Sequence, residues 1–154
     1  MMEKYAIDAC SLINAGKNYS LKKATFNPIW EKVADMIAAG TLISTVEVQD
    51  ELKDDDLVAW GKKNSQLFLP LTKEIQKKAT AILSEFPTMI KMKSSGNSSA
   101  DPFLIATASI NGAIVVSDER LGDPSTGDYH IPNVCNRYGI SCITLNNFLD
   151  RILE

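Results

Sequence analysis

The sequence predicts a three-layer α/β/α sandwich built on a central parallel sheet. Short β-type runs alternate with helical patterns along the chain, as expected for βα units. The run at residues 113–117 is continuously apolar up to its final serine, which is typical of a strand covered on both faces. With 154 residues, of which 45% are hydrophobic and 23% charged, residues 1–154 suit one globular domain.

The first half of the chain opens with a short strand at residues 5–8, and a helix is expected after it. Residues 28–39 form a helix with proline at its first position and Gly40 just past its end. A second strand covers residues 41–44. Thr45 then caps a helix that runs from about residue 46 into the 50s.

The second half continues the alternation, and Asn111 and Gly112 form a helix-ending pair within it. In order, we expect a strand at 67–69, a helix after Thr72 to about 86, a polar loop at 91–99, a helix at 102–110, a strand at 113–117, an irregular loop at 122–131, a helix at 132–138 ended by Gly139, a strand at 141–144 and a helix at 145–153.

Charge, cysteine content and hydropathy limit the class of protein. The net charge of −3 argues against nucleic acid, but the objection weakens if four carboxylates bind metal. Cys10, Cys135 and Cys142 are odd in number and lack metal-site spacing with the single His130, so they are expected to be buried small residues. No membrane span and no signal-peptide pattern is present, which favours a cytoplasmic protein.

Acidic residues stand where a parallel sheet gathers its functional groups. Asp8 ends the first strand and Asp118 follows the strongest strand, so both should open on the same edge. Asp101, just before Pro102, should begin a helix facing that edge, and Glu51 should lie in the helix after the second strand. The four acids are therefore expected to meet in one cleft.

Four neighbouring carboxylates repel one another, and a hard divalent cation such as Mg²⁺ or Mn²⁺ removes the conflict. Such an ion polarises a phosphoryl oxygen and activates a water molecule. Simpler interpretations stay open: Asp8 and Asp101 can be plain helix caps, and Asp118 can belong to a solvated turn. Glu51, spaced four residues from Glu47, can belong to an ordinary acidic helix face.

Several segments resemble the motifs of PIN domains. Residues 5–13 resemble the opening motif, 101–108 the third motif and 115–119 the fourth, while Glu51 and Leu52 look like the second. The tail at 131–145 resembles a stand-alone branch related to VapC-type toxins. The resemblance implies a Rossmann-like sheet of order 3-2-1-4-5. It also implies a metal-dependent endoribonuclease, often the toxin of a toxin–antitoxin pair.

The resemblance also implies roles for residues. Asp8, Glu51, Asp101 and Asp118 would be catalytic and would hold Mg²⁺ or Mn²⁺. Further residues have accessory roles: Ser11, Ser117 and Glu119 assist, and Glu47 is the alternative acid of the second motif. The usual motif has Asn where Ser11 stands.

Partners follow from the same hypothesis. Arg120 and Lys93 are the expected RNA contacts because they lie close in sequence to the predicted metal ligands. The expected partners are RNA, a cognate antitoxin and a second copy of the chain, without a membrane. The main alternative is a catalytically inactive PIN-fold binding or regulatory module. A receiver domain or a dehalogenase-type phosphatase fits less well, because Ala9 and Cys10 stand where their second acid is required.

Overall fold

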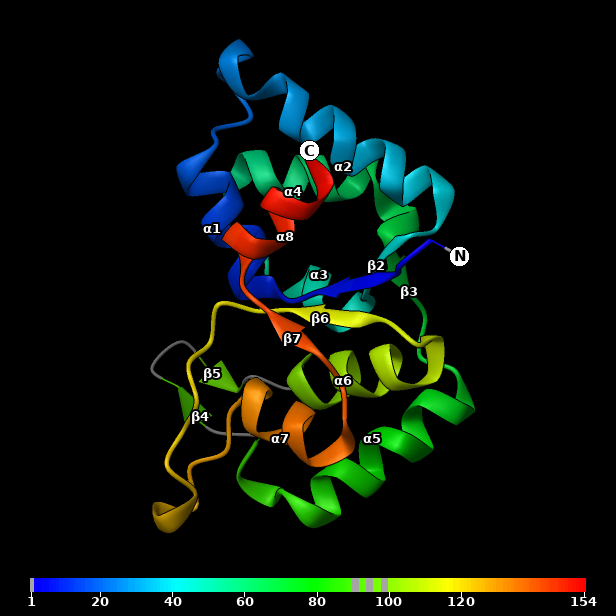
Figure 1. Ribbon diagram of the computed structural model, residues 1–154, viewed down its shortest axis with the longest axis vertical. Helices are drawn as coiled ribbons and strands as arrows, with labels where there is room; N and C mark the ends of the chain where they lie inside the picture. The colour runs from blue at the N-terminus through cyan, green and yellow to red at the C-terminus, as the bar shows by residue number, and fades with distance from the viewer. Residues whose placement is uncertain (1, 90–91, 94–95, 98–99) are drawn as a thin grey trace.

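A computed structural model describes residues 2–89, 92–93, 96–97 and 100–154 and shows a parallel five-stranded sheet between two layers of helices (Figure 1). The strands of this sheet are β1 (Tyr5–Ile7), β2 (Leu42–Thr45), β3 (Phe68–Leu69), β6 (Ile114–Val116) and β7 (Cys142–Ile143). Their order is β3-β2-β1-β6-β7, which confirms the predicted order 3-2-1-4-5.

β1 is the centre of the sheet and fixes its register. Tyr5 pairs with Leu42 of β2 on one side and with Ile114 of β6 on the other. All three residues of β1 are buried, as expected for a strand covered by helices on both faces. Because every pairing within the five-stranded sheet is parallel, the carboxyl ends of β1, β2 and β6 lie along one edge of this sheet.

The helices cover both faces of the sheet. Figure 1 shows α1, α2, α4 and α8 on one face and α5, α6 and α7 on the other. The α-helices are α1 (Ala9–Asn18), α2 (Asn27–Ala39), α3 (Val46–Asp50), α4 (Asp55–Lys63), α5 (Lys73–Glu85), α6 (Ala100–Asn111), α7 (Ile131–Tyr138) and α8 (Leu145–Ile152). Short 3₁₀ helices are η1 (Ala24–Phe26), η2 (Ser65–Leu67), η3 (Pro87–Met89) and η4 (Pro124–Thr126).

Helix ends agree with the predicted caps. Gly40 and Gly139 follow α2 and α7 with φ values of 76° and 67°, in the left-handed region where glycine carries no steric penalty. The Thr45 and Thr72 hydroxyls accept hydrogen bonds from the first turns of α3 and α5. None of the described helices has the length and apolar character needed to cross a bilayer.

The prediction of one helix from about residue 46 into the 50s is wrong, because the chain forms two helices there. α3 ends at Asp50, and Glu51 is its C-cap rather than a residue inside a helix. A separate helix, α4, starts after Asp54, whose carboxylate accepts the Leu57 N–H at 3.1 Å. The chain changes direction between the two helices, where Leu52 is buried (4% exposed) and Asp54 caps the second helix.

Two further boundaries differ from expectation. α6 begins at Ala100, so Asp101 lies in its first turn and is not its N-cap. Pro102 as third helical residue is tolerated, because the first N–H groups of a helix have no intrahelical partner. Within the predicted loop at 91–99, β4 (Met92–Lys93) pairs with β5 (Gly96–Asn97), and residues 90–91, 94–95 and 98–99 lie outside the described residues.

Candidate functional site

Asp8 stands between β1 and α1, at the carboxyl edge of the sheet. It caps α1, and its Oδ1 accepts the Ser11 N–H at 2.7 Å. The residue is only 3% exposed. The sequence prediction of a helix cap is therefore confirmed, and the cap is compatible with a functional role.

The carboxyl group of Asp8 has an unusual environment. Burial raises its pKa from 3.8 to about 6, and the negative charge of Glu119 adds to the rise. Hydrogen bonds from Ser117 and from Ser11 act in the opposite direction. A buried acid that has two serines and a second acid around it combines the features of a functional site.

Asp118 follows β6 and is held by groups from two other elements. Its Oδ2 accepts the Asn14 side-chain N–H of α1 at 2.7 Å. Its Oδ1 accepts the backbone N–H of Leu145, the first residue of α8, at 2.8 Å. The carboxylate is thereby fixed between α1 and α8, next to the strand end. Each of its oxygens keeps a second lone pair.

The accessory residues cluster with Asp8. Ser11 is fully buried, and its hydroxyl donates a long hydrogen bond of 3.4 Å to the Val116 carbonyl. Ser117 is 2% exposed, and its hydroxyl accepts the Glu119 N–H at 3.1 Å. This turn brings the Glu119 carboxylate within electrostatic range of Asp8. Ser11, Ser117 and Glu119, expected to assist Asp8, therefore surround it.

β7 reaches the same cluster. A hydrogen bond with Cys135 lowers the pKa of the Cys142 thiol, against burial and the negative charges of Asp8 and Glu119. Cys135 is buried and Cys142 partly buried, but Cys10 is exposed. The expectation of three buried cysteines is thus wrong for Cys10, which lies on the solvent side of the first turn of α1.

The other predicted acids lie on elements near this edge. Asp101 is half-buried in the first turn of α6, which packs against β1, β2 and α3. Glu51 is half-buried at the end of α3, with its Oε2 atom buried, and Glu47 lies in the first turn of α3. That Glu51 and Asp101 converge on Asp8 stays a prediction. Within the described ranges, no group of three or more His, Cys, Asp or Glu side chains could hold a metal ion.

The predicted RNA contacts lie on two segments. Arg120 is exposed at the start of the loop between β6 and α7. The backbone of Lys93 lies in β4, but its side chain lies outside the described residues.

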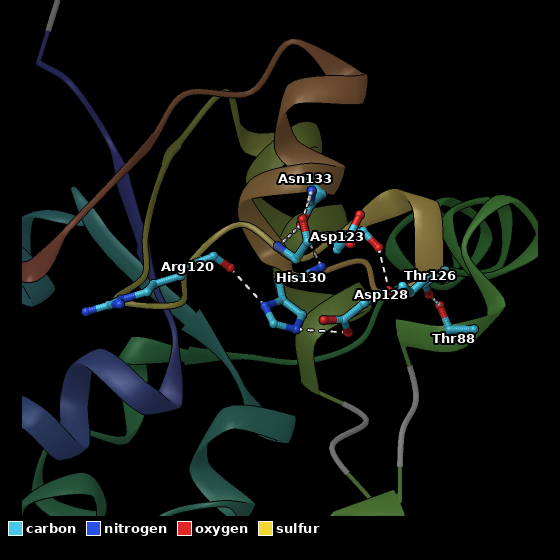
Figure 2. Close-up of polar contacts among 9 residues, drawn as sticks. Thr88, Arg120, Asp123, Thr126, Asp128, His130 and Asn133 are labelled. Carbon is cyan, nitrogen blue, oxygen red and sulfur yellow. Dashed lines mark hydrogen bonds and ion pairs between the residues drawn. The ribbon is translucent and has the colours of Figure 1, made fainter.

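The loop after Arg120 is irregular, as the sequence predicts, apart from the short helix η4, and side-chain hydrogen bonds hold it in place (Figure 2). Asn133 binds Gly122, and the Thr88 hydroxyl donates to the Gly127 carbonyl at 2.7 Å. The rings of Phe86 and Tyr129 pack edge to face, with their centroids 4.9 Å apart.

Sequence reasoning missed Asn14, His130 and Asn133. Asn14 lies three residues after Ser11 in α1, so helical spacing alone puts both side chains on one face. That spacing was the available signal. The bonds of His130 and Asn133 join residues ten or eleven positions apart across an irregular segment, and no local pattern reveals them.

The side chains near Asp8 are of the chemical types that bind a hard divalent cation, although no three acids, histidines or cysteines among the described residues stand together in an arrangement that could hold one. Asp8, Asp118 and Glu119 offer carboxylate oxygens, and Ser117 offers a hydroxyl, which are the ligand types that Mg²⁺ and Mn²⁺ accept. The raised pKa of Asp8 shows that negative charge is unfavourable at this position. A bound cation would reverse that effect.

Comparisons with known proteins show the fold and the family. The crystal structure of PAE2754 from Pyrobaculum aerophilum is similar with a TM-score of 0.52 and 15% sequence identity, over 99% of this chain and 98% of that chain. A likeness at this identity shows the fold alone. A search of curated proteins finds no match. A family model covers residues 5–152, and the chain therefore belongs to the family described as Domain of unknown function (DUF4411).

Proposed function

We propose that the protein is a Mg²⁺- or Mn²⁺-dependent endoribonuclease that hydrolyses phosphodiester bonds in RNA. The observation that carries the proposal is the buried carboxyl of Asp8, contacted by Ser11 and Ser117 and facing the charge of Glu119. Asp118 follows the neighbouring strand at the same edge. Buried negative groups of this kind are stabilised by a cation.

Asp8 and Asp118 would hold the ion, and Asp101 and Glu51 would complete the set, with Glu47 as the alternative to Glu51. A bound ion of this kind polarises a phosphoryl oxygen and makes a bound water more acidic. The chain's own contribution is orientation. The Ser11 amide fixes one oxygen of Asp8, and Asn14 fixes one oxygen of Asp118.

Ser117 and Glu119 have supporting roles in this proposal. The Ser117 hydroxyl hydrogen-bonds to Asp8, and it would keep a water molecule beside that carboxyl. Glu119, half-buried in the same turn, would act as an accessory acid. Arg120, the next residue, would bring positive charge to a phosphate group.

A cleavage assay tests the proposal. The parent protein should cut a labelled single-stranded RNA with Mn²⁺ or Mg²⁺ and should stop when EDTA is added. Asp8→Asn should fold normally and lose cleavage. Asp35→Asn, on the exposed side of α2, is the matched control and should cut like the parent. Equal rates of RNA cleavage for Asp8→Asn and the parent would contradict the proposal.

The resemblance to VapC-type toxins supports a more specific proposal. The protein would be the cytoplasmic toxin of a toxin–antitoxin pair, with an antitoxin and a second copy of the chain as partners. Induced expression in a bacterial host should then stop growth in the parent but not in Asp8→Asn. Co-expression of a small DNA-binding protein from the neighbouring gene should restore growth, and arrest by both forms would contradict a nuclease toxin.

A catalytically inactive PIN-fold module is the second candidate, and one observation favours it. Both oxygens of Asp118 already accept one hydrogen bond each, from Asn14 and from the Leu145 amide, so protein groups hold this acid without an ion. Such a module would bind RNA or a protein with the same affinity in Mn²⁺ and in EDTA. The nuclease proposal instead requires that cleavage depend on the ion.

A further inference from the structure

The loop after β6 is held on both sides of Leu121. His130 Nδ1 lies 2.8 Å from the Arg120 carbonyl oxygen and donates to it, because a carbonyl oxygen can only accept. On the other side, the Gly122 N–H donates to Asn133 Oδ1 at 2.7 Å, and Asn133 Nδ2 donates to the Gly122 carbonyl at 3.3 Å (Figure 2). Three hydrogen bonds thus fix the backbone around one residue.

The anchoring residues belong to the beginning of α7. His130 is its N-cap and Asn133 its third residue, and Asn133 Oδ1 also accepts the His130 N–H at 2.9 Å. His130 Nε2 lies 3.1 Å from Asp128 Oδ1, and it donates to that oxygen when both ring nitrogens carry a proton. The rigid start of α7 therefore determines where the preceding loop lies.

This anchored backbone carries two exposed side chains, which we call the Arg120–Leu121 tip. The Arg120 side chain extends away from His130 in Figure 2, and it makes no ion pair or hydrogen bond with any other described residue. Leu121 is 62% exposed. The other exposed large hydrophobic residues of the described chain, Met2 and Leu153, lie at its ends. A cation and an apolar side chain thus lie side by side on a backbone that is already fixed, so binding through them would cost little conformational entropy.

The tip directly follows the candidate site. Glu119 precedes Arg120, and its charge acts on Asp8. The turn from Ser117 to Glu119 is closed by a hydrogen bond of 3.1 Å, so few freely rotating bonds separate Asp8 from the tip. Arg120 therefore follows directly in sequence on the segment that borders Asp8.

We propose that the Arg120–Leu121 tip is an RNA-contacting element of this site, and that His130 and Asn133 are positioning residues that act through it. The inference rests on the proposed function. The Arg120 guanidinium would bind a phosphate of single-stranded RNA next to the scissile one, since Arg matches phosphate geometry with two donors. Leu121 would cover the face of an unstacked base.

RNA binding in EDTA tests the tip without requiring cleavage. The probe is a fluorescein-labelled single-stranded RNA of mixed sequence, followed by anisotropy at several salt concentrations. Arg120→Ala should raise the Kd roughly tenfold and reduce the salt slope by about one counterion. Leu121→Ser should raise the Kd about fivefold with the salt slope unchanged. Lys77→Ala and Leu153→Ser, which remove exposed side chains of the same kinds elsewhere, should bind like the parent.

A double-mutant cycle tests the positioning role of His130. His130→Ala should weaken binding, and Arg120→Ala/His130→Ala should bind no more weakly than Arg120→Ala alone. Additive losses would mean that His130 does not act through Arg120 and would overturn its assignment.

These measurements distinguish a failure of the tip proposal from a failure of the nuclease proposal. If Arg120→Ala and Leu121→Ser stay within twofold of the parent, the tip proposal is overturned even when the parent cuts RNA. The same holds if they change only self-association measured by light scattering, because the tip would then be a protein interface. If both weaken RNA binding as expected but the parent never cuts with Mn²⁺, the tip stands and the nuclease proposal fails.

Discussion

The Asn14 side chain donates a hydrogen bond of 2.7 Å to Oδ2 of Asp118, and so joins the first helix to the end of β6. The two residues are 104 positions apart in sequence. The bond holds the carboxylate in the orientation in which the Leu145 amide binds its other oxygen. An amide that orients a carboxylate at a metal site affects the affinity for the ion without touching it.

The first prediction concerns Asn14. Asn14→Ala should weaken Mn²⁺ binding about 10- to 100-fold, because Asp118 loses the group that orients it. Isothermal titration calorimetry with Mn²⁺ measures the effect. Lys17→Ala, on the exposed side of the same helix, is the control and should bind Mn²⁺ like the parent. Unchanged affinity in Asn14→Ala would show that the orientation of Asp118 has no part in binding the ion.

The second prediction concerns Asp8 and pH. Its pKa is about 6 in the folded protein against an ordinary 3.8, so the folded state binds the proton more tightly than the unfolded state. The associated stability is fully present below about pH 4 and is lost as the pH rises through 6. Asp8→Asn keeps an oxygen for the Ser11 amide and removes the buried charge. At pH 7, without divalent ions, the free energy of unfolding of the variant should be about 3 kcal/mol higher than that of the parent.

Urea unfolding at pH 7 and at pH 3.5 checks this prediction. The gain should nearly disappear at pH 3.5, where Asp8 of the parent is protonated in the folded state and mostly protonated in the unfolded state. Mn²⁺ should then stabilise the parent at pH 7 and leave Asp8→Asn unchanged. If the variant is less stable than the parent at pH 7, burial does not disfavour the charged form of Asp8.

The third prediction concerns Gly122. A Cβ at this position would lie 2.1 Å from the Asp128 carbonyl oxygen, which is backbone and cannot give way easily. Gly122→Ala should therefore displace the loop and lower the free energy of unfolding by roughly 1–3 kcal/mol. The Gly127 and Asp128 amides donate hydrogen bonds to carbonyl oxygens within the same loop. Their hydrogen exchange should become faster.

Gly16→Ala is the matched control for that substitution. Gly16 lies inside α1, and a Cβ there would meet Leu57 at 3.7 Å, an ordinary contact distance. Alanine should stabilise this helix by about 0.5–1 kcal/mol. Thermal unfolding of both variants should therefore give shifts of opposite sign. Equal effects would show that the space around Gly122 is not what requires glycine.

Local sequence patterns were sufficient to predict most of the fold. Gly40 and Gly139 end helices because only glycine enters the left-handed region without a steric penalty, and Thr72 caps a helix with its own hydroxyl. The break between α3 and α4 was missed. The acidic and apolar spacing continues through it, and the turn depends on the burial of Leu52 in the core.

The site was predicted less completely than the fold. Strand ends identified Asp8 and Asp118, because parallel topology brings strand ends to one edge. Helical spacing places Asn14 on the same face as Ser11, but its bond to Asp118 and the Asn133 contacts to Gly122 depend on tertiary distances that local periodicity does not contain. The position of Asp101 within α6, rather than before it, depends on a helix that starts two residues ahead of its proline.

Diffraction from a crystal soaked in Mn²⁺ shows whether these acids share an ion, because the anomalous signal of the ion locates it without reference to activity. We expect Mn²⁺ at the carboxyl edge of the sheet, bound by Asp8, Asp118 and Asp101. No anomalous peak there, or a peak whose ligands leave out Asp8, would contradict it.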